Sequence, residues 1–137
     1  MDLLDAHKMA DAARCRAISI HLADAFVHRR PYTWKDTEVL ISGGACWMRH
    51  RKAVIATHLR RGIQLGFHGM VEETVLDRLN AIAWMAFGHR QLFRMELSPV
   101  RIGRRLRPNY SREGVAIYLW STEIHPAKAY TMFYLPK

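Results

Sequence analysis

The segment from Met70 to Phe87 limits the choice of fold more than any other part of the chain. Its apolar residues recur at steps of three and four, which places them on one face of a helix. They are Val71, Val75, Leu79, Ile82 and Ala86, and the face is widened by Leu76, Ala83 and Phe87. Gly69 precedes the segment and Gly88 follows it, as expected of residues that flank a helix. The pattern predicts an amphipathic helix in the middle of the fold.

One tryptophan interrupts the polar side of this helix. Glu73, Asp77 and Asn80 lie opposite the apolar residues, and Trp84 continues the same line. Large aromatic rings are mostly buried, so we expect another element, such as the first helix, to cover Trp84. The alternative is that Trp84 anchors a protein–protein contact, including self-association.

Two further helices are predicted upstream. Residues 2–30 form a long first helix that Pro31 ends. Residues 45–61 form a second helix that ends at Gly62, with a core face made of Trp47, Met48, Val54, Ile55 and Leu59. Residues 31–44 fit either a capped helical turn or a short strand, and the sequence leaves both open.

From Gln91 onward the apolar period changes to two, which indicates strands. We expect strands at residues 93–97, 100–106, 115–121 and 127–135. The predicted fold class is α+β, with three or four N-terminal helices packed on a C-terminal antiparallel sheet of three or four strands. We expect a single domain over residues 1–137, mainly helical over 1–90 and mainly antiparallel β over 91–137.

The charge of the chain is strongly positive. Its 137 residues include 21 Lys and Arg against 12 Asp and Glu, a formal net charge of +9. Residues 39–71 contain no acidic residue, and residues 97–137 carry a second basic excess. Such a charge is typical of proteins that bind nucleic acid or a ribonucleoprotein. Most of these residues are Arg, which the codon usage of a GC-rich genome can also produce.

The candidate nucleic-acid contacts fall into two groups. Arginine forks bind phosphates and a nearby tyrosine can stack on a base, which favours the group Arg101, Arg104, Arg105, Arg107, Tyr110 and Arg112. The second group is Arg49 and Arg60, which flank a flat, small-residue face of the predicted second helix. Tyr118 and Trp120 share one face of a predicted strand, where they would either join the first group or pack on the helices.

Catalytic and metal signatures are weak. The chain contains no P-loop, dinucleotide fingerprint, Gly-x-Ser-x-Gly elbow or His-Glu-x-x-His motif. Cys46 and His50 have helical ligand spacing but no closing pair follows, so we predict no metal and no cofactor. One enzymatic alternative is a metal-independent ribonuclease that uses Glu123 and His125 with Tyr110 and Arg112.

The sequence therefore favours a small, basic, non-enzymatic protein that binds nucleic acid or a ribonucleoprotein. The alternative is a stoichiometric inhibitor or adaptor of phage or mobile-element type, for example an inhibitor of host defence or of CRISPR. Trp84, Trp120 and Tyr118 would then supply the protein contacts. The longest apolar run is too short to cross a bilayer and no signal peptide is present, so we expect a cytoplasmic protein without a membrane partner. The oligomeric state stays open, with a homodimer among the options.

Overall fold

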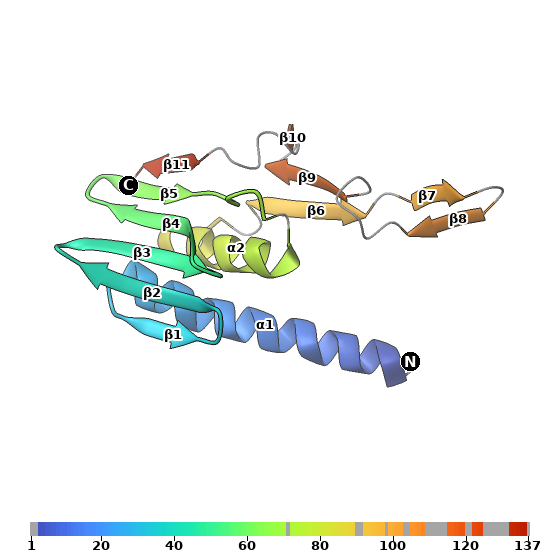
Figure 1. Ribbon diagram of the computed structural model, residues 1–137, viewed down its shortest axis with the longest axis horizontal. Helices are drawn as coiled ribbons and strands as arrows, with labels where there is room; N and C mark the ends of the chain where they lie inside the picture. Colours follow the sequence, from blue (N-terminus) through green and yellow to red (C-terminus); the bar gives the residue numbers. More distant parts are fainter. Residues whose placement is uncertain are drawn as a thin grey trace.

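The architecture is a helix, an antiparallel strand meander, a second helix and a further set of strands (Figure 1). The computed structural model describes the backbone of residues 3–70, 72–89, 92–97, 99–102, 105–108, 115–119, 122–124 and 132–136, and the side chains of 14–70, 72–89, 92–93 and 132–136. The first helix, α1, spans Leu3–Val27. The meander consists of β1 (Tyr32–Trp34), β2 (Thr37–Ser42), β3 (Ala45–His50), β4 (Ala53–Leu59) and β5 (Gly62–Leu65).

The main sheet has six strands in the order β1-β2-β3-β4-β5-β11, and every pairing in it is antiparallel. Its last strand, β11 (Phe133–Pro136), returns from the end of the described chain to pair with β5. Gly43 and Gly44, both with positive φ, connect β2 to β3. Two-residue hairpin loops need this backbone conformation, and glycine adopts it without strain.

Both helices cover the same face of the main sheet (Figure 1). The second helix, α2 (Glu73–Phe87), packs against α1, and the two share a core with the inward residues of the strands. The largest fully buried side chains include Phe26 from α1, Met48 and Ile55 from the sheet, and Leu79 and Ile82 from α2. Burial of these apolar groups is the main favourable contribution to folding.

The prediction of a helix around residues 70–87 is confirmed. Gly88 ends α2 in the left-handed conformation, with φ of 74°. Asn80 does not point into solvent as a polar-face residue would. Its amide donates to the Phe93 carbonyl oxygen at 2.7 Å and accepts from the Phe93 N–H at 2.8 Å, which fixes the following strand against α2.

The remaining strands form two smaller sheets. One contains β6 (Phe93–Leu97), β9 (Val115–Leu119) and β10 (Thr122–Ile124), and the other is a hairpin of β7 (Pro99–Ile102) and β8 (Arg105–Pro108). The predicted strand at 93–97 is confirmed, and the one at 115–121 is confirmed over Val115–Leu119, the part that the structure describes. The predicted strand at 100–106 is wrong, because its residues belong to the two antiparallel strands β7 and β8. Of the predicted strand at 127–135, residues 127–131 lie outside the described residues and residues 133–135 lie in β11. The rings of Phe67, Phe93 and Phe133 meet at centroid distances of 4.8–6.3 Å and join β6 to the main sheet.

The predicted arrangement of three or four helices on a sheet of three or four strands is wrong. The described part of the chain has two helices and a six-stranded antiparallel sheet, although its α+β character is as expected. The main error concerns residues 45–61, which form the β3–β4 hairpin rather than a helix. Residues 31–44, for which the sequence leaves helix and strand open, form β1 and β2. No helix in the described ranges is long and apolar enough to cross a membrane.

Candidate nucleic-acid interface

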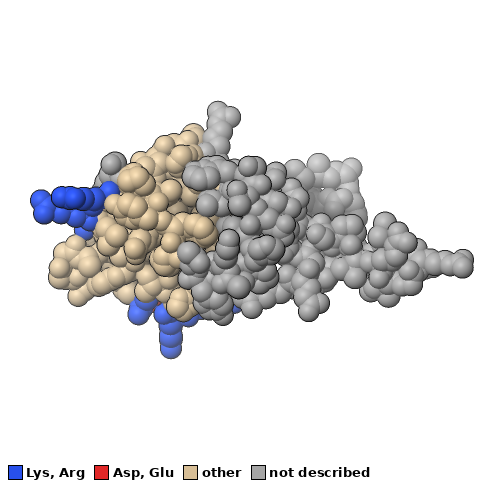
Figure 2. All heavy atoms as spheres, turned by 90° about the horizontal axis from the view of Figure 1, so that it is seen from above, with Lys and Arg blue, Asp and Glu red and all other residues tan. Residues whose placement is uncertain are grey.

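Four arginines lie at one end of the main sheet, which we call the basic end: Arg29, Arg30, Arg60 and Arg61. The sheet register brings them together. The β4–β5 turn carries Arg60 and Arg61, and it lies beside the β2–β3 turn because Cys46 pairs with His58 and Leu59 pairs with Gly62. The β2–β3 and β4–β5 turns lie at the left in Figure 1, and Figure 2 shows Lys and Arg side chains that project on the same side.

The C-terminus of α1 is attached to the same end of the sheet. The carbonyl oxygen of Phe26 lies 3.2 Å from His58 Nδ1 and 3.6 Å from the Cys46 thiol, which donates to it. Arg29 donates to the Gly44 carbonyl oxygen at 2.8 Å. These contacts position the helix end, and with it Arg29 and Arg30, beside the start of β3 and the end of β4.

One carboxylate lies among these arginines. Asp24 forms an ion pair with Arg30, and its second oxygen lies 3.0 Å from His28 Nδ1. These pairs are solvent-exposed, so they contribute little to stability. Asp24 offsets only one of the four arginines that define the basic end, so these residues keep a positive excess.

The β4–β5 turn is held in place by the final strand. Arg60 and Arg61 are both exposed, and the Arg61 carbonyl oxygen accepts a hydrogen bond from the Tyr134 hydroxyl at 2.9 Å. A Cβ atom at Gly62 would lie 2.5 Å from the Leu135 carbonyl oxygen and 2.7 Å from the Tyr134 ring. Glycine is therefore required at this position by close packing and does not serve as the predicted end of a helix.

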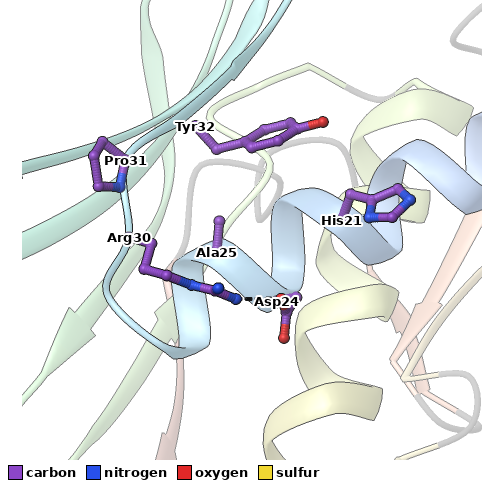
Figure 3. Close-up of a pocket in the computed structure, with 6 residues that line it drawn as sticks. All are labelled: His21, Asp24, Ala25, Arg30, Pro31 and Tyr32. Carbon is purple, nitrogen blue, oxygen red and sulfur yellow. Dashed lines mark hydrogen bonds and ion pairs between the residues drawn. The ribbon is translucent and has the colours of Figure 1, made fainter.

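A pocket of about 210 Å³ adjoins the basic end, between α1 and β1 (Figure 3). It is lined by His21, Asp24, Ala25, Arg30, Pro31 and Tyr32. The Tyr32 ring extends above the helix surface at Ala25 and His21, and Arg30 runs along the helix to Asp24. Polar groups thus surround a space between an aromatic ring and a small apolar patch.

The structure places the predicted contact residues Arg60 and Arg49 in different surroundings. Arg60 lies in the basic end, as an exposed turn residue instead of a helical one. Arg49 lies on β3, where its guanidinium donates to Glu38 of the neighbouring strand at 2.6 Å, so it is not grouped with Arg60. The prediction that both flank one helix face is wrong, because the segment forms two strands.

The larger predicted arginine group lies mostly outside the described residues. Arg104, Tyr110, Arg112 and Trp120 are outside them, as is His125 of the ribonuclease alternative. The side chains of Arg101, Arg105, Arg107, Tyr118 and Glu123 are also outside, and only their backbone is described. That backbone places Arg101 opposite Leu106 and Arg105 opposite Ile102 in the β7–β8 hairpin, and Glu123 opposite Tyr118 in the β9–β10 pair.

Trp84 is exposed on α2, with 48% of its surface accessible. Within the described ranges, the cover expected for it from another element is therefore incomplete. Tyr32 and Trp34 of the edge strand β1 are also exposed, each at 39%. The protein has accessible aromatic rings at both sites.

A second polar cluster lies at the opposite end of the sheet from the basic end, where β2 begins and β3 ends. Thr37 and His50 face each other in register and are almost fully buried, with their Oγ1 and Nδ1 atoms 2.7 Å apart. Arg78 of α2 is also buried and donates to the Ser19 hydroxyl at 2.6 Å, to the Cys15 carbonyl oxygen at 3.2 Å and to Thr37 at 3.4 Å. This cluster ties both helices to the sheet.

Burial in this cluster favours the neutral form of His50. Burial lowers the pKa of His50, with Asp36 and Glu72 opposing the shift and Arg51 and Arg78 adding to it. Among the described residues, His50 Nε2 has no hydrogen-bond partner, and the nearest Glu72 oxygen is 3.7 Å away. Arg51 connects the two carboxylates, with ion-pair distances of 2.6 Å to Glu72 and 3.5 Å to Asp36.

The cysteines fit structural roles. Burial raises the pKa of the Cys46 thiol, and burial together with Asp77 raises that of Cys15. Cys46 and His50 lie four positions apart on a strand, which separates them by about 13 Å, too far to share a metal. In the described part of the chain no three His, Cys, Asp or Glu side chains are placed to hold a metal ion.

Sequence reasoning misses Arg29, Arg30, Arg61 and Tyr32 as candidate contacts. It assigns Arg29 and Arg30 only to the end of the first helix, and the register that joins them to Arg61 follows from a hairpin that it does not predict. The glycine pair Gly43-Gly44 is the available signal, because such pairs often form two-residue hairpin loops.

The chain matches no protein-family model, no curated protein and no solved structure.

Proposed function

We propose that this protein is a small, non-enzymatic binding module that engages the phosphate backbone of nucleic acid, alone or in a ribonucleoprotein, through its basic end. The observation that carries the proposal is the convergence of Arg29, Arg30, Arg60 and Arg61 from two separate segments onto one end of the sheet. Guanidinium forks bind phosphate oxygens in bidentate fashion. Turn residues and a helix end project beyond the sheet, so they can reach a backbone without steric interference from the core.

The overall charge supports the same partner. A net charge of +9 attracts polyanions and accelerates their association. The stretch that contributes Arg60 and Arg61 contains no acidic residue between positions 39 and 71. Long-range attraction by the net charge and local contacts by exposed arginines would thus both favour a polyanionic partner.

The test is fluorescence anisotropy of labelled single-stranded and duplex DNA and RNA across a salt series. The double variant Arg60→Ala/Arg61→Ala is expected to weaken binding to all of these probes and to flatten its salt dependence. The matched control is Arg14→Ala/Arg16→Ala, which removes two exposed arginines from α1 far from the basic end. No binding by the wild-type protein near physiological salt, or equal losses in the two double variants, would contradict the proposal.

Exposed Trp84 favours a second candidate function, a stoichiometric inhibitor or adaptor that docks on a protein. Tryptophan is enriched among residues that dominate protein interfaces, and this ring is 48% accessible on α2. Under this alternative, Trp84→Ala abolishes capture of the protein partner while the arginine variants retain it. Under the leading proposal, Trp84→Ala leaves nucleic-acid affinity unchanged.

A further inference from the structure

We infer that the pocket between Tyr32 and α1 receives one unpaired nucleobase of a single-stranded nucleic acid, stacked on the Tyr32 ring. This inference rests on the proposed function, and it names the strand type and the site at which a base would be held. Three features carry it: the size of the pocket, the surfaces that line it and its position beside the basic end.

The size of the pocket suits a single ring system. Sites for drug-sized ligands usually measure about 300–1,000 Å³. This pocket is smaller, at about 210 Å³, so it accommodates one base more readily than a whole cofactor.

The lining of the pocket matches the flat face and the polar edge of a base. The Tyr32 ring is 39% exposed and extends over Ala25 and His21, which leaves a flat space between the ring and the helix (Figure 3). A base in this space would stack on the tyrosine, as bases do in single-strand-binding proteins. Around the edge of the space, His21 and Asp24 provide hydrogen-bonding groups for the rim of a base.

The position of the pocket supplies the phosphate contact. Arg30 lines the pocket and belongs to the basic end, and Arg29 is its neighbour in sequence. A nucleotide whose base enters the pocket therefore has its phosphates beside guanidinium groups. In a duplex, the bases are paired and stacked on one another, so a base would first have to leave the stack.

Asp24 gives the pocket a base preference. Each of its carboxylate oxygens already has one partner, Arg30 for one and His28 for the other, and each can accept a further hydrogen bond. Carboxylates accept from the amino group of cytosine, which thymine and uracil lack. Cytosine is therefore favoured over thymine at this site.

The test compares single-stranded dC12, dT12 and a duplex by anisotropy with two matched variants. Tyr32→Ala is expected to weaken binding of single strands by roughly 10-fold, because stacking on an aromatic ring is lost. Tyr32→Phe retains the ring and is expected to bind as the wild type does. Trp34→Ala is the control, because Trp34 lies on the same face of β1 with the same 39% exposure but does not line the pocket.

The outcomes separate this inference from the proposed function. If Arg60→Ala/Arg61→Ala weakens binding but Tyr32→Ala behaves like Trp34→Ala, the nucleobase site is overturned and the phosphate interface stands. If no probe binds, both are overturned. Asp24→Asn is expected to remove the preference for dC12 over dT12 while raising affinity for both, since it deletes a negative charge; an unchanged preference would overturn the assigned role of Asp24.

Discussion

The Thr37 hydroxyl and His50 Nδ1 lie 2.7 Å apart across two neighbouring strands, and neither side chain is more than 1% exposed. Arg78 can only donate, and it donates to the same hydroxyl oxygen at 3.4 Å. The hydroxyl can then donate a hydrogen bond to His50 Nδ1. This arrangement suits a neutral imidazole that accepts at Nδ1 and carries its proton at Nε2.

The stability of the protein is expected to fall in mild acid through His50. Burial lowers the pKa of this group below its ordinary value of 6.5, against the influence of Asp36 and Glu72 and with that of Arg51 and Arg78. Between the folded and unfolded pKa values the unfolded state binds more protons, so the free energy of unfolding decreases as pH drops below about 6.5. Urea denaturation between about pH 5 and pH 8 measures this change. His50→Asn is expected to flatten the pH dependence, and an unchanged slope would refute the assignment.

Arg78 is expected to be a major determinant of stability. Replacing it with Ala removes the donor to Ser19 Oγ and to the Cys15 carbonyl oxygen, at a cost of about 2–3 kcal/mol in the free energy of unfolding. Arg78→Lys is expected to recover only part of this loss, because one ammonium group cannot reproduce the spread of the guanidinium fork. Chemical denaturation of the two variants provides the comparison, and an Ala variant as stable as the wild type would show that the cluster is dispensable.

Gly62→Ala is expected to loosen the final strand. The added Cβ would overlap the Leu135 carbonyl oxygen and the Tyr134 ring, so β5 and β11 have to move apart. Overpacking of this kind costs about 1–3 kcal/mol. Thermal unfolding should show a lower midpoint than in the wild type. Gly43→Ala is a control for the backbone effect alone, because its positive φ is unfavourable for Ala while no atom of the described residues lies within 4 Å of its Cβ position.

Arg49 and Arg60 are expected to differ in their effect on nucleic-acid binding. Arg49 lies 2.6 Å from Glu38, so its charge is already partly matched, whereas Arg60 is exposed in the basic end. The logarithmic salt slope for duplex DNA should decrease by about 0.9 for each phosphate that the protein no longer neutralises. Arg60→Ala should show this decrease and Arg49→Ala should show little or none. Equal decreases would place the interface on the outer face of the sheet.

Cys46 is expected to resist thiol reagents in the folded protein. Its side chain is fully buried and burial raises its pKa, so little thiolate is formed or accessible. Labelling with a thiol reagent near pH 8 should modify the partly exposed Cys15 first and Cys46 only as the protein unfolds. Simultaneous labelling of both would contradict this order.

Since the raised thiol pKa favours the folded state only while the thiols are protonated, stability is also expected to decline above about pH 9.

The sequence is most informative where periodicity and end signals agree. The apolar spacing of α2 and its stop at Gly88 predict a helix that the structure confirms, and the final turn of α1 precedes Pro31 as expected. These features are local, because a helix is determined by residues three and four apart. The sheet register is not predictable in the same way.

The β3–β4 hairpin resembles a helix in sequence for two physical reasons. Its turn residues Arg51 and Lys52 adopt positive φ although neither is Gly or Asn, so the usual hairpin signal is missing. A bulge between Met48 and Arg49 also shifts the register, and Ile55 and Ala56 are both buried in succession. The clean alternation of a strand is thereby lost. Because the basic end depends on this hairpin, the candidate site could not be assembled from the sequence.

The pairing of β11 with β5 has a consequence for how the protein reaches its folded state. Each neighbouring pair from β1 to β5 closes through a turn of a few residues, but β11 joins β5 only after α2 and the smaller sheets intervene. Long loops close at a greater entropic cost, so the meander is expected to form first and β11 to dock last. Until it does, β5 offers open backbone donors and acceptors to any other extended chain, including another copy of the same protein. The Tyr134–Arg61 hydrogen bond and the close packing at Gly62 hold β11 against β5, and they therefore protect the protein against aggregation.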